Sequence, residues 1–91
     1  MNRDTYISLS SLAMDLDRVS IGLYRKSDKM AERFIQEALK RKSEIDSSTV
    51  KPYIKDLLER MERDLHSQDR DKKAEDALMY CTLFQNAALA S

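Results

Sequence analysis

The sequence has few of the residues that form sheets and tight turns. Its 91 residues include one glycine, one proline, one cysteine, one histidine and no tryptophan. Because hairpins and sheet-rich folds depend on glycine and proline at their turns, such folds are not expected here. The chain is rich instead in Leu, Ala, Met, Glu, Lys and Arg, which favour helices. We therefore predict an all-α fold, with residues 1–91 forming a single helical-bundle domain.

The scarcity of cysteine, histidine and glycine also limits the chemistry. Cys81 alone cannot form an internal disulfide and fits a reducing compartment, so a cytoplasmic location is expected. His66 is the only histidine, and Arg63 stands three residues before it, where di-iron bundles carry glutamate. Gly22 alone cannot build a glycine-rich phosphate loop. No metal site and no cofactor are expected.

Net charge and long hydrophobic runs are missing as well. Sixteen basic and sixteen acidic residues cancel, so no overall field favours nucleic acid or an anionic membrane. No segment approaches the roughly 18 apolar residues that a transmembrane helix requires. Ser8, Ser10 and Asp15 interrupt the N-terminal stretch, so a signal peptide is not expected.

The first half of the chain has the spacing of two amphipathic helices. The first is expected to follow a cap at Asp4 or Thr5 and to end near residues 25–26. Gly22 lies in its last turn, where it allows a close helix contact or marks a bend. The second helix is expected to start after a cap at Ser27. Its apolar face consists of Met30, Ala31, Phe34, Ile35, Ala38 and Leu39. Because no glycine or proline enforces the break between them, one long bent helix is the open alternative.

The second half predicts two more helices. The third should begin near Ser48 or Thr49, with Pro52 in its first turn. Its expected buried residues are Val50, Tyr53, Ile54, Leu57, Leu58, Met61 and Leu65. Ser67 or Asp69 can cap the fourth. Short connections between helices predict an up-down four-helix bundle.

The first helix carries two apolar stripes where a surface helix usually carries one. The first stripe follows spacings of three and four and consists of Leu9, Leu12, Leu16, Val19 and Leu23. The second recurs every seven residues at Ile7, Met14 and Ile21, well around the helix from the first. The fourth helix has a similar surplus at Met79 and Leu83. We expect the interface of a homodimer to consist of Ile7, Met14, Ile21, Met79 and Leu83.

A basic stripe on the second helix is a candidate contact for nucleic acid. It consists of Lys29, Arg33 and Lys40, and each side chain that met a phosphate would add to the salt dependence of binding. Glu32 and Glu37 flank the stripe and weaken its field. We therefore favour a solvated helix face and expect no nucleic-acid binding.

Arg60 and His66 give an alternative reading. Five residues separate them in the segment RMERDLH, which resembles the Arg-x(4–6)-His signature of the four-helix HEPN ribonucleases. The resemblance implies RNA processing or RNA binding in which Arg60 and His66 take part in cleavage, often across a dimer.

The interpretation that the whole pattern favours is a small, non-enzymatic interaction or regulatory module. Helical surfaces are its most distinctive feature. Its expected partners are a second copy of itself and possible further proteins, with no membrane and no nucleic acid.

Overall fold

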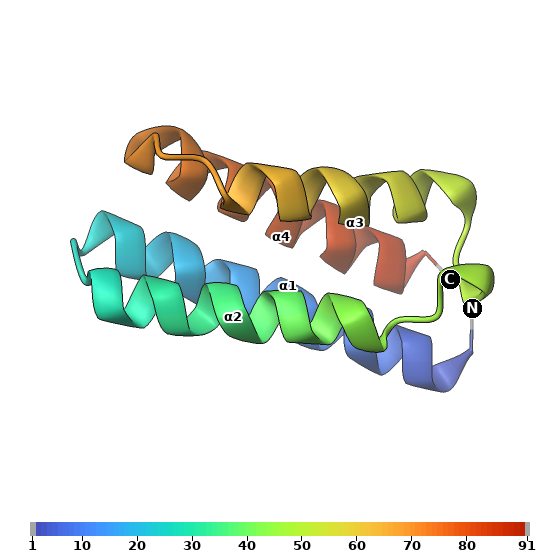
Figure 1. The fold of residues 1–91 in the computed structure, drawn as a ribbon. Coiled ribbons are helices and arrows are strands. Elements are labelled where there is room, and N and C mark those ends of the chain that lie inside the picture. The colour runs from blue at the N-terminus through green and yellow to red at the C-terminus, as the bar shows by residue number, and fades with distance from the viewer. Residues whose placement is uncertain (1, 91) are drawn as a thin grey trace.

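The computed structural model describes residues 2–90, and within them the chain folds into four α-helices and a short 3₁₀ turn. The elements are α1 (Arg3–Tyr24), α2 (Asp28–Glu44), η1 (Ser47–Thr49), α3 (Pro52–Leu65) and α4 (Arg70–Leu89). Successive helices run antiparallel, with α1 and α2 in one layer and α3 and α4 in the other (Figure 1). The predicted all-α, up-down four-helix bundle with short connections is confirmed.

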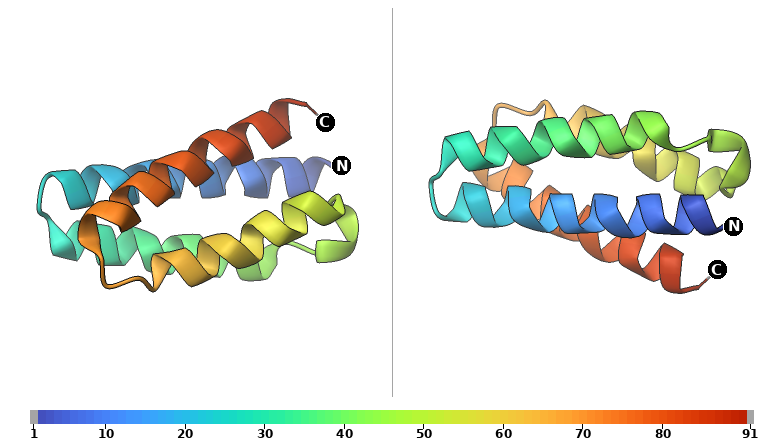
Figure 2. Two further views of the ribbon diagram at one scale, coloured as in Figure 1. Left: turned by 90° about the horizontal axis from the view of Figure 1, so that it is seen from above. Right: turned by 90° about the horizontal axis from the view of Figure 1, so that it is seen from below.

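Helix α1 is the central element of this bundle. It packs along both α2 and α4, whereas α2 and α3 touch at few positions. Helix α4 crosses α1 obliquely, as the left view of Figure 2 shows. All five residues of the first predicted stripe are buried, and Ala13, Ser20 and Gly22 are buried with them. The buried face of α1 is therefore wider than its leucine spacing predicts, because two helices cover it.

A hydrogen-bonded turn ends α1 and separates it from α2. The Ser27 amide donates to the Gly22 carbonyl at 2.8 Å, and the Lys26 amide donates to the Leu23 carbonyl at 3.1 Å. Lys26 lies in the left-handed region with φ of 57°. These are the two hydrogen bonds of a Schellman motif, which ends α1 without glycine. The alternative of one long bent helix is wrong for this reason.

Gly22 allows the close helix contact that its position suggested. A Cβ atom built there would lie 2.9 Å from the backbone nitrogen of Ala31 on α2 and 3.1 Å from the Ala31 Cα. Real side chains do not come this close to backbone atoms. The absence of a side chain at Gly22 therefore sets how closely α1 and α2 approach.

Two of the predicted helix starts need correction. Helix α1 is capped by Asn2, whose side-chain oxygen accepts from the Thr5 amide at 2.8 Å, so Asp4 and Thr5 lie inside the helix. Helix α3 begins at Pro52 rather than near Ser48, because residues 47–49 form the separate turn η1. The prediction of Asp69 as the cap of α4 is confirmed, since its side chain accepts from the Lys72 amide at 3.0 Å.

Most of the predicted stripe on α3 is buried, but Tyr53 is not. Ile54, Leu58, Met61 and Leu65 are buried, whereas Tyr53 is 53% exposed. Tyr53 lies about 100° around the helix from Ile54, at the edge of the stripe, and therefore escapes burial.

Small residues on α4 make room for a neighbouring helix. Ala74, Ala77, Cys81 and Ala88 are all buried, and α4 packs most extensively on α1. Their short side chains allow this approach. Within residues 2–90, none of the helices combines the length and the hydropathy that a bilayer span requires.

Candidate functional site

The outer face of α1 carries the second stripe of the sequence. Ile7 is 48% exposed and Met14 is 53% exposed, while Ile21 is half-buried. All three lie on the side of α1 turned away from the buried Leu9 and Leu16. Large apolar side chains are thus presented to solvent along one line of the central helix.

The two predicted interface residues of α4 lie elsewhere. Met79 is exposed and Leu83 is half-buried. Leu83 lines a hollow of about 500 Å³ between α3 and α4, together with Tyr53, Asp56, Leu57, Arg60, Asn86, Ala87 and Ala90. Met79, one turn earlier, is on the same side of α4. The structure therefore does not bring Met79 and Leu83 onto one face with the α1 stripe.

Arg60 and His66 take separate places on α3. Arg60 lines the hollow between α3 and α4, and its Nε lies 3.0 Å from the Asp56 carboxylate. His66 is the C-cap residue of α3 and is exposed. Within one copy of the chain, Arg60 is oriented toward Asp56 and the C-terminal part of α4, while His66 marks the end of the helix.

The three basic residues predicted on α2 are also divided. Lys29 and Arg33 line one hollow with Met30 and Phe34 near the start of the helix. Lys40 lies about two turns further on and is exposed. The structure thus groups two of the three with an aromatic side chain that the sequence pattern had assigned to the core.

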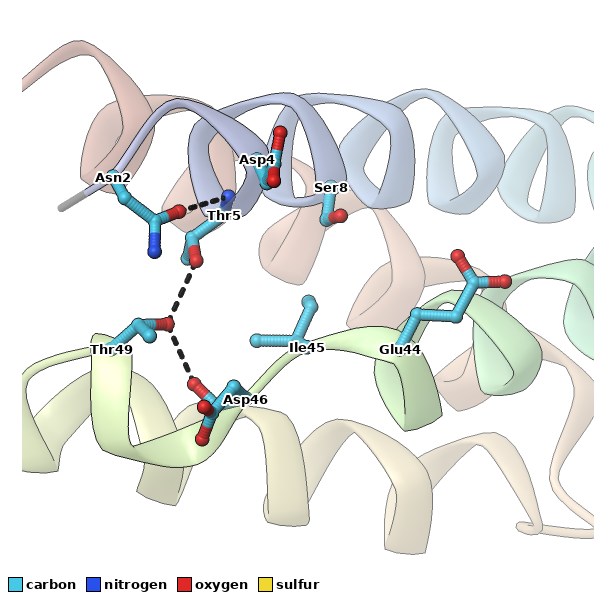
Figure 3. Close-up of a pocket in the computed structure, with 8 residues that line it drawn as sticks. All are labelled: Asn2, Asp4, Thr5, Ser8, Glu44, Ile45, Asp46 and Thr49. Atoms are coloured by element: carbon cyan, nitrogen blue, oxygen red, sulfur yellow. Dashed lines mark hydrogen bonds between the residues drawn. The ribbon is translucent and has the colours of Figure 1, made fainter.

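A polar hollow at the opposite end of the α1–α2 layer joins the start of α1 to the connection after α2 (Figure 3). It measures about 230 Å³ and is lined by Asn2, Asp4, Thr5, Ser8, Glu44, Ile45, Asp46 and Thr49. The hydroxyls of Thr5 and Thr49 are 2.7 Å apart, and the Thr49 hydroxyl donates to the Asp46 carbonyl at 2.6 Å. This chain of bonds fixes η1 against the first turn of α1.

The Asp46 carboxylate in this hollow is poorly suited to general base catalysis. The Asp46 side chain accepts from the backbone amide and the hydroxyl of Ser48, and these bonds lower the pKa of Asp46. A carboxylate so stabilised is a poor base. Within residues 2–90, no three His, Cys, Asp or Glu side chains are grouped so that they could hold a metal ion. The hollow is best explained as a structural clamp.

Two carboxylates outside the hollows have shifted acidities. Burial raises the pKa of Asp15 on α1, and the charge of Arg41 opposes this shift only in part. At Asp64 on α3, burial acts to raise the pKa, but hydrogen bonds from Tyr80 and Arg63 outweigh it and the pKa is lowered. Neither group lies beside a nucleophile, so we assign both a structural role.

Sequence reasoning missed two residues of these surfaces, Tyr53 and Phe34. Both were assigned to buried faces, yet Tyr53 borders the hollow between α3 and α4 and Phe34 borders the basic hollow on α2. Helical phase contains a signal for Tyr53, because it lies at the edge of its stripe. No signal in the sequence marks Phe34, whose surroundings depend on Arg18 of another helix.

Comparison of the chain with protein-family models, with curated proteins and with solved structures found no match.

Proposed function

We propose that this chain is a small, non-enzymatic interaction module of the cytoplasm that acts by pairing with a second copy of itself through the outer face of α1. The observation that supports this proposal is the exposure of Ile7 and Met14 along one line of the central helix. Covering apolar side chains in such a line with a matching surface removes them from water and lowers the free energy.

The spacing of the stripe favours an antiparallel pair. Met14 lies near the middle of α1 (Arg3–Tyr24), with Ile7 seven residues before it and Ile21 seven residues after it. A two-fold axis through Met14 would place Met14 beside Met14 of the second copy and Ile7 beside Ile21 of the second copy. An isologous interface needs a surface that matches itself in this way.

The charges at the ends of the stripe favour the same arrangement. Asp4 and Arg25 are exposed and lie on one flank of the stripe, ten residues before and eleven residues after Met14. In an antiparallel pair, Asp4 meets Arg25 of the second copy. In a parallel pair, the two Asp4 side chains would lie at one end of the interface and the two Arg25 side chains at the other, which lacks this pairing of opposite charges.

The affinity of such a pair should be modest. Three half-covered side chains from each copy offer a limited gain, and the loss of independent motion of the two copies offsets much of it. A dissociation constant of about 10 to 100 µM is the scale that we expect.

Sedimentation equilibrium over this concentration range tests the proposal. The wild-type chain should associate reversibly, and Met14→Glu should remain a folded monomer, because a carboxylate would be buried without a partner. Thr82→Glu is the matched control, since Thr82 is exposed on α4, and it should associate like the wild type. Monomeric wild-type protein, or a Met14→Glu variant that still associates, would refute the proposal.

A further inference from the structure

The basic hollow on α2 combines an apolar wall with a positively charged rim. It measures about 360 Å³ and is lined by Ser27, Lys29, Met30, Arg33 and Phe34. Met30 and Phe34 are half-buried, whereas Lys29 and Arg33 are exposed. Apolar atoms therefore form the depth of the hollow, and charged groups stand at its edge.

Arg18 on α1 extends the rim from a second helix. Its guanidinium carbon lies 5.3 Å from the centre of the Phe34 ring, and the guanidinium carbon of Arg33 lies 5.5 Å from the same centre. Both distances are within the range of cation–π attraction. The ring of Phe34 thus orders two guanidinium groups beside the hollow.

The acidic residues closest in sequence are already engaged. Asp28 pairs with Arg70 of α4, and the Glu32 carboxylate accepts from the Gln36 amide at 3.0 Å. Within residues 2–90, no carboxylate lies in ion-pair range of Lys29 or Arg33. Arg18 lies 4.0 Å from the Asp15 carboxylate, so Lys29 and Arg33 supply the unpaired positive charge of the rim.

We infer that this hollow binds an acidic segment of a partner protein. A large apolar side chain of the segment packs against Met30 and Phe34, and carboxylates on either side of it pair with Lys29, Arg33 and Arg18. Arginine suits such pairing because its planar group binds carboxylates through two hydrogen bonds.

The geometry favours a peptide over nucleic acid. One aromatic ring borders the hollow, and guanidinium carbons lie 5.3 and 5.5 Å from its centre, over the ring where a base would stack. The rim is also short, since Lys40 lies about two turns away along α2 and outside the hollow. A backbone of regularly spaced phosphates would need a longer positive track.

The experiment is a selection of short random peptides displayed on phage, with the full chain as the target. Enriched peptides should carry Asp or Glu on both sides of a large apolar residue. Synthetic copies of them should bind the double variant Lys29→Glu and Arg33→Glu at least about tenfold more weakly than the wild type, since two attractive charge pairs become repulsive. Lys40→Glu, which makes the same change of charge outside the hollow, should bind like the wild type.

Three outcomes would overturn the inference. One is a selection without enrichment. Another is a set of peptides that lack acidic residues or that bind the double variant and the wild type equally. The third is binding of an oligouridylate RNA that weakens steeply between about 50 and 200 mM salt and is lost in the double variant, which would make the hollow a phosphate contact.

A control on folding keeps the test decisive. Thermal unfolding followed by circular dichroism should show the double variant folded, because both altered side chains are exposed. Should it unfold, Lys29→Gln with Arg33→Gln removes the charges without reversing them, and the same loss of peptide binding is expected. These changes lie on α2 and leave Ile7, Met14 and Ile21 unaltered, so a loss of peptide binding with unchanged self-association distinguishes this inference from the proposed function.

Discussion

Gly22 and Ala31 bring the backbones of α1 and α2 into close contact. A Cβ atom on Gly22 would lie 2.9 Å from the Ala31 nitrogen and 3.3 Å from the Ala31 Cβ. The obstacle is the backbone of α2, which cannot turn aside as a flexible side chain would. The two helices therefore pack backbone to backbone beside the turn that joins them.

Gly22→Ala should destabilise the fold. Forcing extra atoms into a packed site costs roughly 1 to 3 kcal/mol, and the gain in helix propensity offsets at most about 1 kcal/mol of this. Urea unfolding followed by circular dichroism measures the difference. Ser11→Ala, on the outer side of α1, should be close to neutral; a Gly22→Ala variant as stable as the wild type would show that the helices separate freely.

Lys26→Gly should stabilise the fold by about 0.5 to 1 kcal/mol. Lys26 adopts φ of 57°, a conformation that is strained for a residue with a side chain and relaxed for glycine. Arg25→Gly is the matched control, since Arg25 has φ of −83° and should lose stability or remain unchanged. The midpoint of thermal unfolding should rise for the first variant alone.

Tyr80→Phe should remove about 1.5 to 3 kcal/mol of stability, the range for a hydrogen bond to a charged group. The Tyr80 hydroxyl donates to the Asp64 carboxylate at 2.6 Å, and Tyr80 is buried. Because the pKa of Asp64 is lowered in the fold from 3.8, its contribution is present above pH 3.8 and is lost as the pH falls through the folded-state value. The penalty in Tyr80→Phe should therefore shrink once the pH falls below the folded-state pKa of Asp64, and a penalty that stays constant across an acid titration that protonates Asp64 would contradict this assignment.

Asp15→Asn should show the opposite pH dependence. Burial raises the pKa of Asp15 above 3.8, so its protonated form favours the fold below that pH, and this contribution is lost as the pH rises through the folded-state value. The variant should thus be more stable than the wild type at pH 7 and gain no such advantage near pH 3. This pH dependence is tested by measuring the free energy of unfolding of each protein at both pH values, with Asp17→Asn as the exposed control.

The fold was largely predictable because α1, α2 and α3 each have a clear apolar period. Leu9, Leu12 and Leu16 are buried as their spacing predicts, and Asp69 caps α4 as its residue type predicts. The turn at Lys26 was harder to predict, since a non-glycine residue in the left-handed conformation leaves no trace in the sequence. The turn is held by the hydrogen bonds that the Lys26 and Ser27 amides donate to the Leu23 and Gly22 carbonyls.

The candidate surfaces were less predictable than the fold. Periodicity identified Ile7 and Met14 as a second stripe, and both are exposed in the single chain. Which surface a residue joins depends on how neighbouring helices are placed, and this is why Leu83 faces a hollow shared with α3. The basic hollow was missed because Phe34 was expected to be buried, whereas it is half-buried and borders the hollow.

The most direct test of self-association is disulfide cross-linking of Met14→Cys, with Cys81→Ala so that one thiol remains. If two copies of α1 pair antiparallel about Met14, the two new thiols face each other within the short reach of a disulfide. Ile7→Cys alone should not cross-link, because its two copies would be about 21 Å apart along the axis. It should cross-link only when mixed with Ile21→Cys.

The measurement is the fraction of covalent dimer on a non-reducing gel after mild oxidation at about 100 µM, the upper end of the range expected for the dissociation constant. We predict efficient dimer formation for Met14→Cys, little for Ile7→Cys, and recovery in the mixture of Ile7→Cys with Ile21→Cys. Cross-linking of Ile7→Cys alone would indicate a parallel pair. Failure of Met14→Cys to cross-link would contradict the proposal that this chain pairs with itself through α1.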